Sequence, residues 1–163
     1  MLQKCLTTTD SVNGHSDVDR ISSESNIDKS GGNAFETSYG KSSDKIGDFT
    51  NLYGTNVDDI LDRIPDEAVL RELRPVEGGC TEGFEFKWIS GGKTYRVRVH
   101  NADPSAPIGS NAANGWVVRV QQGRKYYDYT VDNFMDAKYL NPNGEFFDEI
   151  IVNNSHIPIE SPY

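Results

Sequence analysis

The sequence predicts an α+β domain in which short N-terminal helices pack on a four-stranded antiparallel sheet. Four segments between Phe84 and Tyr129 alternate apolar and polar residues, and Gly-containing turns or a longer loop separate them. Ahead of them, residues 57–73 carry apolar side chains at the three- and four-residue spacing of helices. Helices followed by consecutive antiparallel strands are typical of the α+β class.

The chain of 163 residues divides into two regions of different composition. Residues 1–50 are rich in Ser, Thr, Asp, Asn and Gly and have almost no periodic apolar residues. Such a segment buries too little surface to offset its ordering entropy. It is therefore expected to be a disordered linker or a fragment of a carrier chain, with His15 solvated. Residues 51–163 are expected to form the folded domain.

Two helices are expected at the start of this domain. Thr55 or Asn56 can cap the first, over residues 57–64, with acidic residues in its first turn. Pro65 can begin the second, whose sequence is DEAVLREL, and the Gly78-Gly79 pair follows it. A third helix is expected over residues 131–140 from its apolar spacing.

The strands follow from alternation and turns. Phe84–Trp88 and Tyr95–Val99 flank Gly91-Gly92, which predicts a hairpin. After a long loop, Trp116–Val120 leads through QQGR into Lys125–Tyr129. Four antiparallel strands can bury one face against the helices and leave the other face for a site.

The strand KTYRVRVH presents an unusual polar face. Successive side chains of a strand point to opposite faces, so Arg96, Arg98 and His100 share one face and Tyr95, Val97 and Val99 the other. Guanidinium groups bind phosphate bidentately, and imidazole can transfer a proton near neutral pH. This face is the first place to expect a functional site for a phosphate-bearing partner.

Composition limits the classes of function. A net charge of −9 argues against a general nucleic-acid coating protein but allows a local basic cleft. The two cysteines have no metal-ligand spacing, and no apolar run approaches the length of a transmembrane helix. A signal-peptide pattern is also lacking. The motifs GxxxxGK and HExxH and a paired-carboxylate spacing are missing from the sequence, which argues against a nucleotide hydrolase, a zinc protease and a glycosidase. No metal and no cofactor is expected.

Several short motifs follow one another closely between His100 and Arg119. They are His100-x-x-Asp103-Pro104-x-x-Pro107, Gly109-Ser110-Asn111-Ala112, Gly115-Trp116 and Val118-Arg119, and a His156-Ile157-Pro158 run follows near the end. With these pieces, residues 57–160 resemble the C-terminal toxin domains of bacterial polymorphic toxin systems classed as type 30, which are predicted ribonucleases.

This resemblance implies a module carried at the end of a larger secreted chain. Such a module would be delivered into the cytoplasm of a competitor bacterium, where RNA would be its substrate. A cognate immunity protein would neutralise it in the producing cell.

Metal-independent RNA cleavage requires a base for the 2′-hydroxyl, an acid for the leaving 5′-oxygen and a cation beside the developing charge. His100 and His156 are the candidates for proton transfer, the second through the resemblance. Arg119 interrupts the apolar strand WVVRV and is the candidate cation.

Five further residues are candidates for substrate binding. Arg96 and Arg98 can hold RNA phosphates or can instead pair with carboxylates. Ser110 and Asn111 can donate hydrogen bonds to phosphate, although turn formation is the plainer account of both. Asp103, followed by Pro104, is expected to form a turn rather than to act as a catalytic acid. Tyr127 can stack on a base, and alternation places Tyr126 on the opposite face.

Two other classes of function stay open. An NAD-using toxin, either an ADP-ribosyltransferase or an NAD glycohydrolase, could use the same arginine, Ser-Asn loop and tyrosines for a dinucleotide. A non-catalytic binding module fits the acidic balance of the chain.

Overall fold

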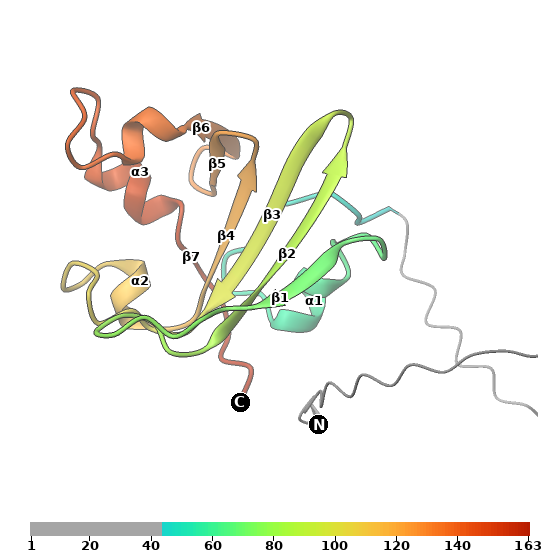
Figure 1. Ribbon diagram of the computed structural model, residues 1–163, viewed down its shortest axis with the longest axis horizontal. Helices are drawn as coiled ribbons and strands as arrows, with labels where there is room; N and C mark the ends of the chain where they lie inside the picture. Colours follow the sequence, from blue (N-terminus) through green and yellow to red (C-terminus); the bar gives the residue numbers. More distant parts are fainter. Residues whose placement is uncertain (1–43) are drawn as a thin grey trace, which may run out of the picture. The chain divides into compact units, whose positions relative to one another are not determined.

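The computed structural model describes residues 44–163, which form an antiparallel sheet with a few short helices (Figure 1). Most of the linker predicted for residues 1–50, including His15, lies outside the described residues. In chain order the elements are α1 (Val57–Leu61), β1 (Val69–Glu72), β2 (Gly83–Ser90), β3 (Lys93–His100), α2 (Asn111–Asn114), β4 (Val117–Gln122), β5 (Lys125–Asp128), β6 (Asn133–Asp136), the 3-10 helix η1 (Ala137–Leu140), α3 (Glu149–Asn154) and β7 (Ile157–Pro158).

The expected four-stranded sheet with N-terminal helices is wrong, because the sheet has seven strands. Its order is β1-β2-β3-β4-β5-β6, and β7 also pairs with β4. The second expected helix is strand β1, in which Val69 pairs with Lys87 and Glu72 with Phe84. Here hydrogen bonding to the free edge of β2 prevails over the helical spacing of the sequence, which is only a weak preference.

The expected third helix is also wrong over its first half. Residues 133–136 form β6, which pairs with β5, and only residues 137–140 continue as a 3-10 helix. A positive φ of 52° at Asp132 forms the turn between the two strands. A turn at this point returns the chain beside β5, so strand pairing is available where the apolar spacing alone suggested a helix.

The predicted strands and the first helix agree better with the structure. Gly91 and Gly92 have positive φ values and connect β2 to β3, and Gly123 does the same between β4 and β5. Helix α1 begins at Val57 and is capped by Asn56, whose side chain accepts a hydrogen bond from the Asp59 amide.

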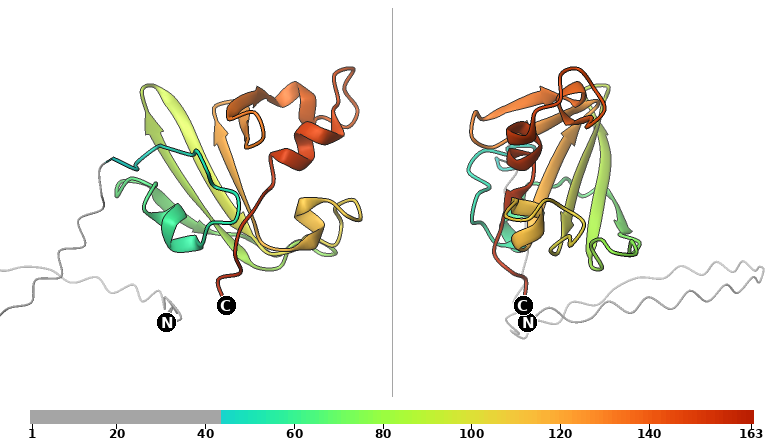
Figure 2. Two further views of the ribbon diagram at one scale, coloured as in Figure 1. Left: turned by 180° about the vertical axis from the view of Figure 1, so that it is seen from behind. Right: turned by 90° about the vertical axis from the view of Figure 1, so that its left-hand side faces the viewer.

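The hydrophobic core lies on one face of the sheet, under the segment that contains α1 (Figure 2). Val97 and Val99 of β3 and Val118 and Val120 of β4 are fully buried there. The opposite side chains of β3 therefore face away from the core, as strand alternation predicted.

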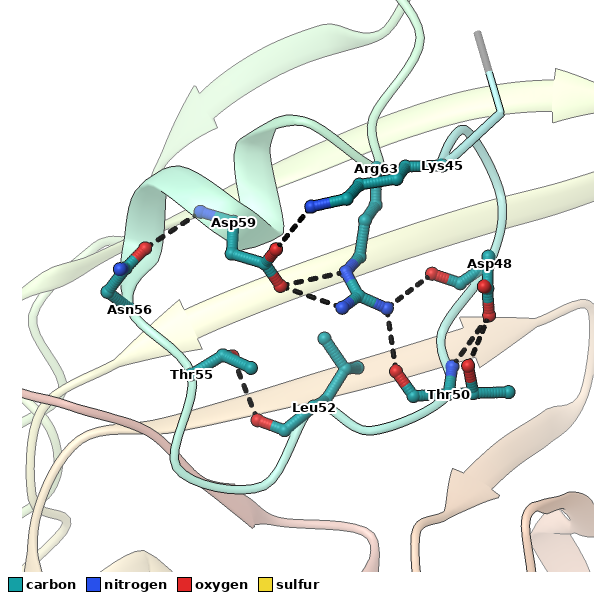
Figure 3. Close-up of polar contacts among 8 residues, drawn as sticks. All are labelled: Lys45, Asp48, Thr50, Leu52, Thr55, Asn56, Asp59 and Arg63. Carbon is teal, nitrogen blue, oxygen red and sulfur yellow. Dashed lines mark hydrogen bonds and ion pairs between the residues drawn. The ribbon is translucent and has the colours of Figure 1, made fainter. Parts of the chain in front are cut away.

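Arg63 fixes the segment ahead of α1 to this helix (Figure 3). Its guanidinium donates hydrogen bonds to the carbonyl oxygens of Asp48 and Thr50 and, over 2.7 Å, to the carboxylate of Asp59. Asp59 also pairs with Lys45. The segment thereby delivers Phe49 and Leu52 to the core.

Gly83 is needed where β2 meets the end of β3. A Cβ at this position would lie 2.3 Å from the carbonyl oxygen of Val99 and 2.9 Å from the Cα of His100, both of which are backbone atoms. Gly83→Ala is therefore expected to lower the free energy of unfolding by roughly 3 kcal/mol in urea denaturation.

Gly115→Ala is the matched control, since a Cβ at Gly115 meets nothing within 4 Å and its φ of 169° is ordinary extended backbone. Equal stability of the two variants would contradict the close approach at Gly83.

Candidate functional site

A row of charged and ionisable residues crosses the sheet on the face away from the core. Arg71 of β1 is opposite Glu85, Glu85 is opposite Arg98, and Arg98 is opposite Arg119. Val118 pairs with Ile157, so continuing this register by one residue brings His156 beside Arg119. We call these five residues the charged row.

Strand β4 has a divided edge at the centre of this row. One edge pairs with β3 along most of its length, and the other pairs with β7 at Val117 and Val118 and with β5 at Gln121 and Gln122. Arg119 lies between these two pairings. The divergence of β5 and β7 therefore opens the sheet at the residue that carries the central cation.

His100 and His156 meet at this opening. Their ring centroids are 6.0 Å apart and the rings are nearly perpendicular, at 81°. Nδ1 of His100 is 2.7 Å from the Asn101 carbonyl oxygen, and Nδ1 of His156 is 2.9 Å from that of Val152. Each carbonyl accepts a hydrogen bond, so each Nδ1 carries the proton and each Nε2 keeps its lone pair for proton transfer.

Both histidines are biased toward the neutral form. Burial lowers the pKa of His156 to about 3, and the charge of Arg119 acts in the same direction. Burial also lowers the pKa of His100, and the charge of Arg119 lowers it further. The hydrogen bond to the Asn101 carbonyl raises this pKa but does not outweigh burial. A negative charge placed beside Arg119 would reverse the effect of this arginine and raise both pKa values.

Arg119 is held in an unusual environment for a guanidinium. Its Cζ lies 4.7 Å from the centre of the Tyr126 ring, in a cation–π contact. Its Nε is fully buried and has no hydrogen-bond partner among the described residues. Burial lowers the pKa of Arg119, and the charge of Arg98 adds to this effect. A bound anion would supply the missing acceptor.

Glu85 balances part of this positive charge. The carboxylate is 2 % exposed and accepts hydrogen bonds from Arg98, at 2.8 Å, and from Arg71, at 2.6 Å. Burial raises its pKa, but the hydrogen bonds and charges of the two arginines outweigh burial, so the pKa is below its ordinary value. Of the two roles left open for Arg98, pairing with a carboxylate is the one observed here.

A small cavity of about 90 Å³ opens over Arg98 and Arg119 of the charged row. Its walls are formed by Glu85, Arg96, Arg98, Arg119, Gln121 and Tyr126. Arg96 has no ion pair with a carboxylate within residues 44–163. Because three guanidiniums and one carboxylate line this cavity, it is suited to a small anion such as one phosphate group.

Ser110 and Asn111 fix the loop between β3 and β4. Ser110 caps α2 by accepting a hydrogen bond from the Ala113 amide. Asn111 donates two hydrogen bonds to Asn153, from its backbone and from its side chain, and thereby joins α2 to α3. Ser110 also lines a second cavity with His156. Asn111 is not among the residues that line either cavity.

The structure does not bring Tyr127 to this face. Its ring is 5 % exposed and packs against Phe134 in the core, and its hydroxyl donates a hydrogen bond to Asp132. Tyr126 of β5 pairs with Gln121 of β4, and it is the tyrosine that lies beside Arg119. The alternation of the strand predicted two faces, but only the pairing of β5 shows which tyrosine belongs to the site.

Sequence reasoning missed Glu85, and it predicted the turn at Asp103 but not that the residue lies near the two histidines. Glu85 was not singled out in the sequence, although a two-residue turn at Gly91-Gly92 places it opposite Arg98. Asp103 forms a turn, with its Oδ1 2.9 Å from the Ser105 amide, and its charge also acts on His100 and His156. Only the fold brings it near His156, which is distant in the sequence.

Comparison with known proteins defines the class to which this fold and site belong. The sequence profile of bacterial toxin 30 matches residues 59–160, which include the whole charged row and both histidines. The chain therefore belongs to the bacterial toxin 30 family. Searches of curated proteins and of solved structures found no match.

Membership of a toxin family implies delivery to a target cell, a carrier and a cognate immunity partner. Within residues 44–163, no helix is long and apolar enough to cross a bilayer. The same residues contain no cluster of three or more His, Cys, Asp or Glu side chains suited to hold a metal ion.

The lowered pKa of His156 predicts a pH-dependent stability. In the unfolded chain His156 binds a proton near its ordinary pKa of 6.5, whereas in the folded chain it does so only near 3. The free energy of unfolding therefore decreases as the pH falls from 6.5 towards 3. Between pH 7 and pH 5 the wild-type chain should lose roughly 1–2 kcal/mol more than His156→Asn in urea denaturation. Asparagine keeps a donor at the position of Nδ1 but cannot titrate.

Carboxylates with lowered pKa values also lose stability in acid, but they are common to both proteins and cancel in the comparison. Parallel stability curves for wild type and His156→Asn would show that the imidazole is not held in its neutral form.

Proposed function

We propose that this toxin domain is a metal-independent endoribonuclease that acts in the cytoplasm of a target bacterium. The observation that carries the proposal is the pair of histidines, 6.0 Å apart, beside an arginine whose buried Nε has no partner among the described residues. Two imidazoles and one cation are the groups that cleavage of RNA through its 2′-hydroxyl requires.

The proposed reaction places the scissile phosphate at Arg119. One histidine Nε2 removes the proton of the 2′-hydroxyl, and the 2′-oxygen attacks phosphorus. The bond from phosphorus to the 5′-oxygen breaks, and the other histidine, as imidazolium, protonates this oxygen. The products are a 2′,3′-cyclic phosphate and a free 5′-hydroxyl, so protons and electron pairs balance without another reactant.

Electrostatics support the required protonation states. In the free protein both histidines favour the neutral form, partly because Arg119 is positively charged. A phosphodiester beside Arg119 offsets this charge and raises both pKa values, so one imidazole can take up a proton when substrate is bound. Asp103 acts in the same direction on both rings.

The other predicted residues take supporting roles in this proposal. Arg96 and Arg98 hold a neighbouring phosphate in the small cavity, and Tyr126 takes the stacking role first expected of Tyr127. Ser110 donates its hydroxyl to a phosphate oxygen, while Asn111 holds α2 in place through Asn153. The immunity protein would neutralise the domain by covering this face.

Cleavage of RNA by the purified chain tests the proposal. Wild type, His100→Asn, His156→Asn and Arg119→Gln are incubated with total bacterial RNA in the presence of a chelator. Each substitution should slow cleavage by roughly 10²-fold or more, because it removes a proton-transfer group or the charge that stabilises the transition state.

His15→Asn is the matched control. His15 is the one histidine of the chain besides the two of the site, and it lies outside the family match. Its rate should equal that of wild type. Intact RNA with the wild-type chain, or undiminished cleavage by both site histidine variants, would refute the ribonuclease proposal. Consumption of NAD in a parallel reaction, with RNA intact, would instead favour the NAD-using alternative.

A further inference from the structure

A second, larger cavity of about 470 Å³ lies between the loop that contains α2 and the segment that contains α3. Both elements lie on the side of the sheet away from α1 and β1 (Figures 1 and 2). The residues that matter for its chemistry are Asp103, Ile108, Ser110, Phe147, Glu149 and His156. Its volume is within the range of pockets that hold small molecules, roughly 300–1,000 Å³.

His156 connects this cavity to the histidine pair. It lines the larger cavity, and it lies beside Arg119, which lines the smaller one. A group bound in the larger cavity is therefore next to one bound at Arg119. The two cavities can hold adjoining parts of one ligand.

The walls of the larger cavity suit a flat, apolar ring. Ile108 is fully exposed and Phe147 is 37 % exposed, although apolar side chains of this size are usually buried. Pro107 and Val152 add further apolar surface. A nucleobase can stack on such an exposed aromatic ring, because every base has a flat π-face.

The charged groups of the larger cavity are acceptors of hydrogen bonds. Asp103 and Glu149 are the two carboxylates in its walls, and Oδ1 of Asp103 already accepts from Ser105. The Glu149 carboxylate has no hydrogen bond or ion pair to any of residues 44–163 and remains available. An ionised carboxylate accepts but cannot donate, so it selects a ligand edge with two adjacent donors.

Charge separates the two cavities. The smaller one is lined by three arginines and one carboxylate, and the larger one has two carboxylates and no lysine or arginine. These charges favour a phosphate in the smaller cavity over one inside the larger cavity. A nucleotide consists of an anionic phosphate and a neutral base, and it matches this arrangement in one orientation only.

We propose that the larger cavity binds the guanine base on the 5′ side of the scissile phosphate, with Glu149 as the residue that determines this specificity. The assignment rests on the ribonuclease function proposed above. Guanine alone among the four bases presents two adjacent donors, N1–H and N2–H₂, on its Watson–Crick edge, and Glu149 accepts both. Ile108 and Phe147 contact the faces of the base.

Equilibrium binding of the four nucleoside 3′-monophosphates to the purified full-length chain tests this assignment by calorimetry, without any cleavage step. Guanosine 3′-monophosphate should bind at least roughly tenfold more tightly than the adenosine, cytidine and uridine compounds, as expected for a good bidentate pair. Glu149→Gln should abolish this preference, because an amide has one acceptor and one donor where guanine presents two donors.

Glu145→Gln is the matched control, an exposed acidic residue of the preceding turn that does not line the cavity, and it should keep the preference. Equal affinities for the four compounds, or a guanosine preference that survives in Glu149→Gln, would overturn the assignment. Cleavage of RNA without preference for guanosine would overturn it as well and leave the ribonuclease proposal standing. Guanosine binding that depends on Glu149, with RNA intact, would support the base site and refute the ribonuclease proposal.

Discussion

The pairing of Arg98 with Arg119 across β3 and β4 is the constraint on which the site depends. Like charges directly opposite each other in a sheet are unfavourable. The protein offsets this repulsion with a carboxylate beside Arg98. Glu85 accepts hydrogen bonds from Arg98 and from Arg71 at the edge of the sheet. Arg119 instead lies over the face of Tyr126, and its Nε has no partner among residues 44–163. Positive charge therefore accumulates at one end of the charged row, beside the two histidines. An anion at that end would complete the compensation.

The divided edge of β4 gives this charge a place to act. A continuous neighbour along β4 would cover Arg119 with another strand. Instead β5 leaves after Gln121 and β7 returns only at Val118, and the chain between them forms β6, η1 and α3. This detour brings His156 beside Arg119 and joins α3 to α2 through Asn111 and Asn153. The irregular part of the fold thus builds the site, and the regular hairpin of β2 and β3 supports it.

Much of this arrangement could be read from the sequence, because it depends on local pattern. Alternation in β3 placed Arg96 and Arg98 away from Val97 and Val99, and Gly91-Gly92 gave the hairpin. The errors arose where long-range pairing decides the outcome. Val69–Glu72 has helical spacing but pairs with β2, and the segment after Val131 turns at Asp132 into β6. The proximity of His156 to His100 depends on β7, a strand of only two residues that no periodicity reveals. Tyr126 and Tyr127 were separated by alternation, but the choice between them needed the direction of the core.

The chemical nature of the cleaved ends tests the central claim most directly. In the presence of a chelator, ³¹P NMR of RNA fragments produced by the purified chain should show 2′,3′-cyclic phosphates, because two imidazoles and Arg119 can drive attack by the neighbouring 2′-oxygen without a metal ion. Fragments with 5′-phosphate and 3′-hydroxyl ends would mean that water attacks instead. That result, or activity that disappears with the chelator and returns with a divalent cation, would contradict the account.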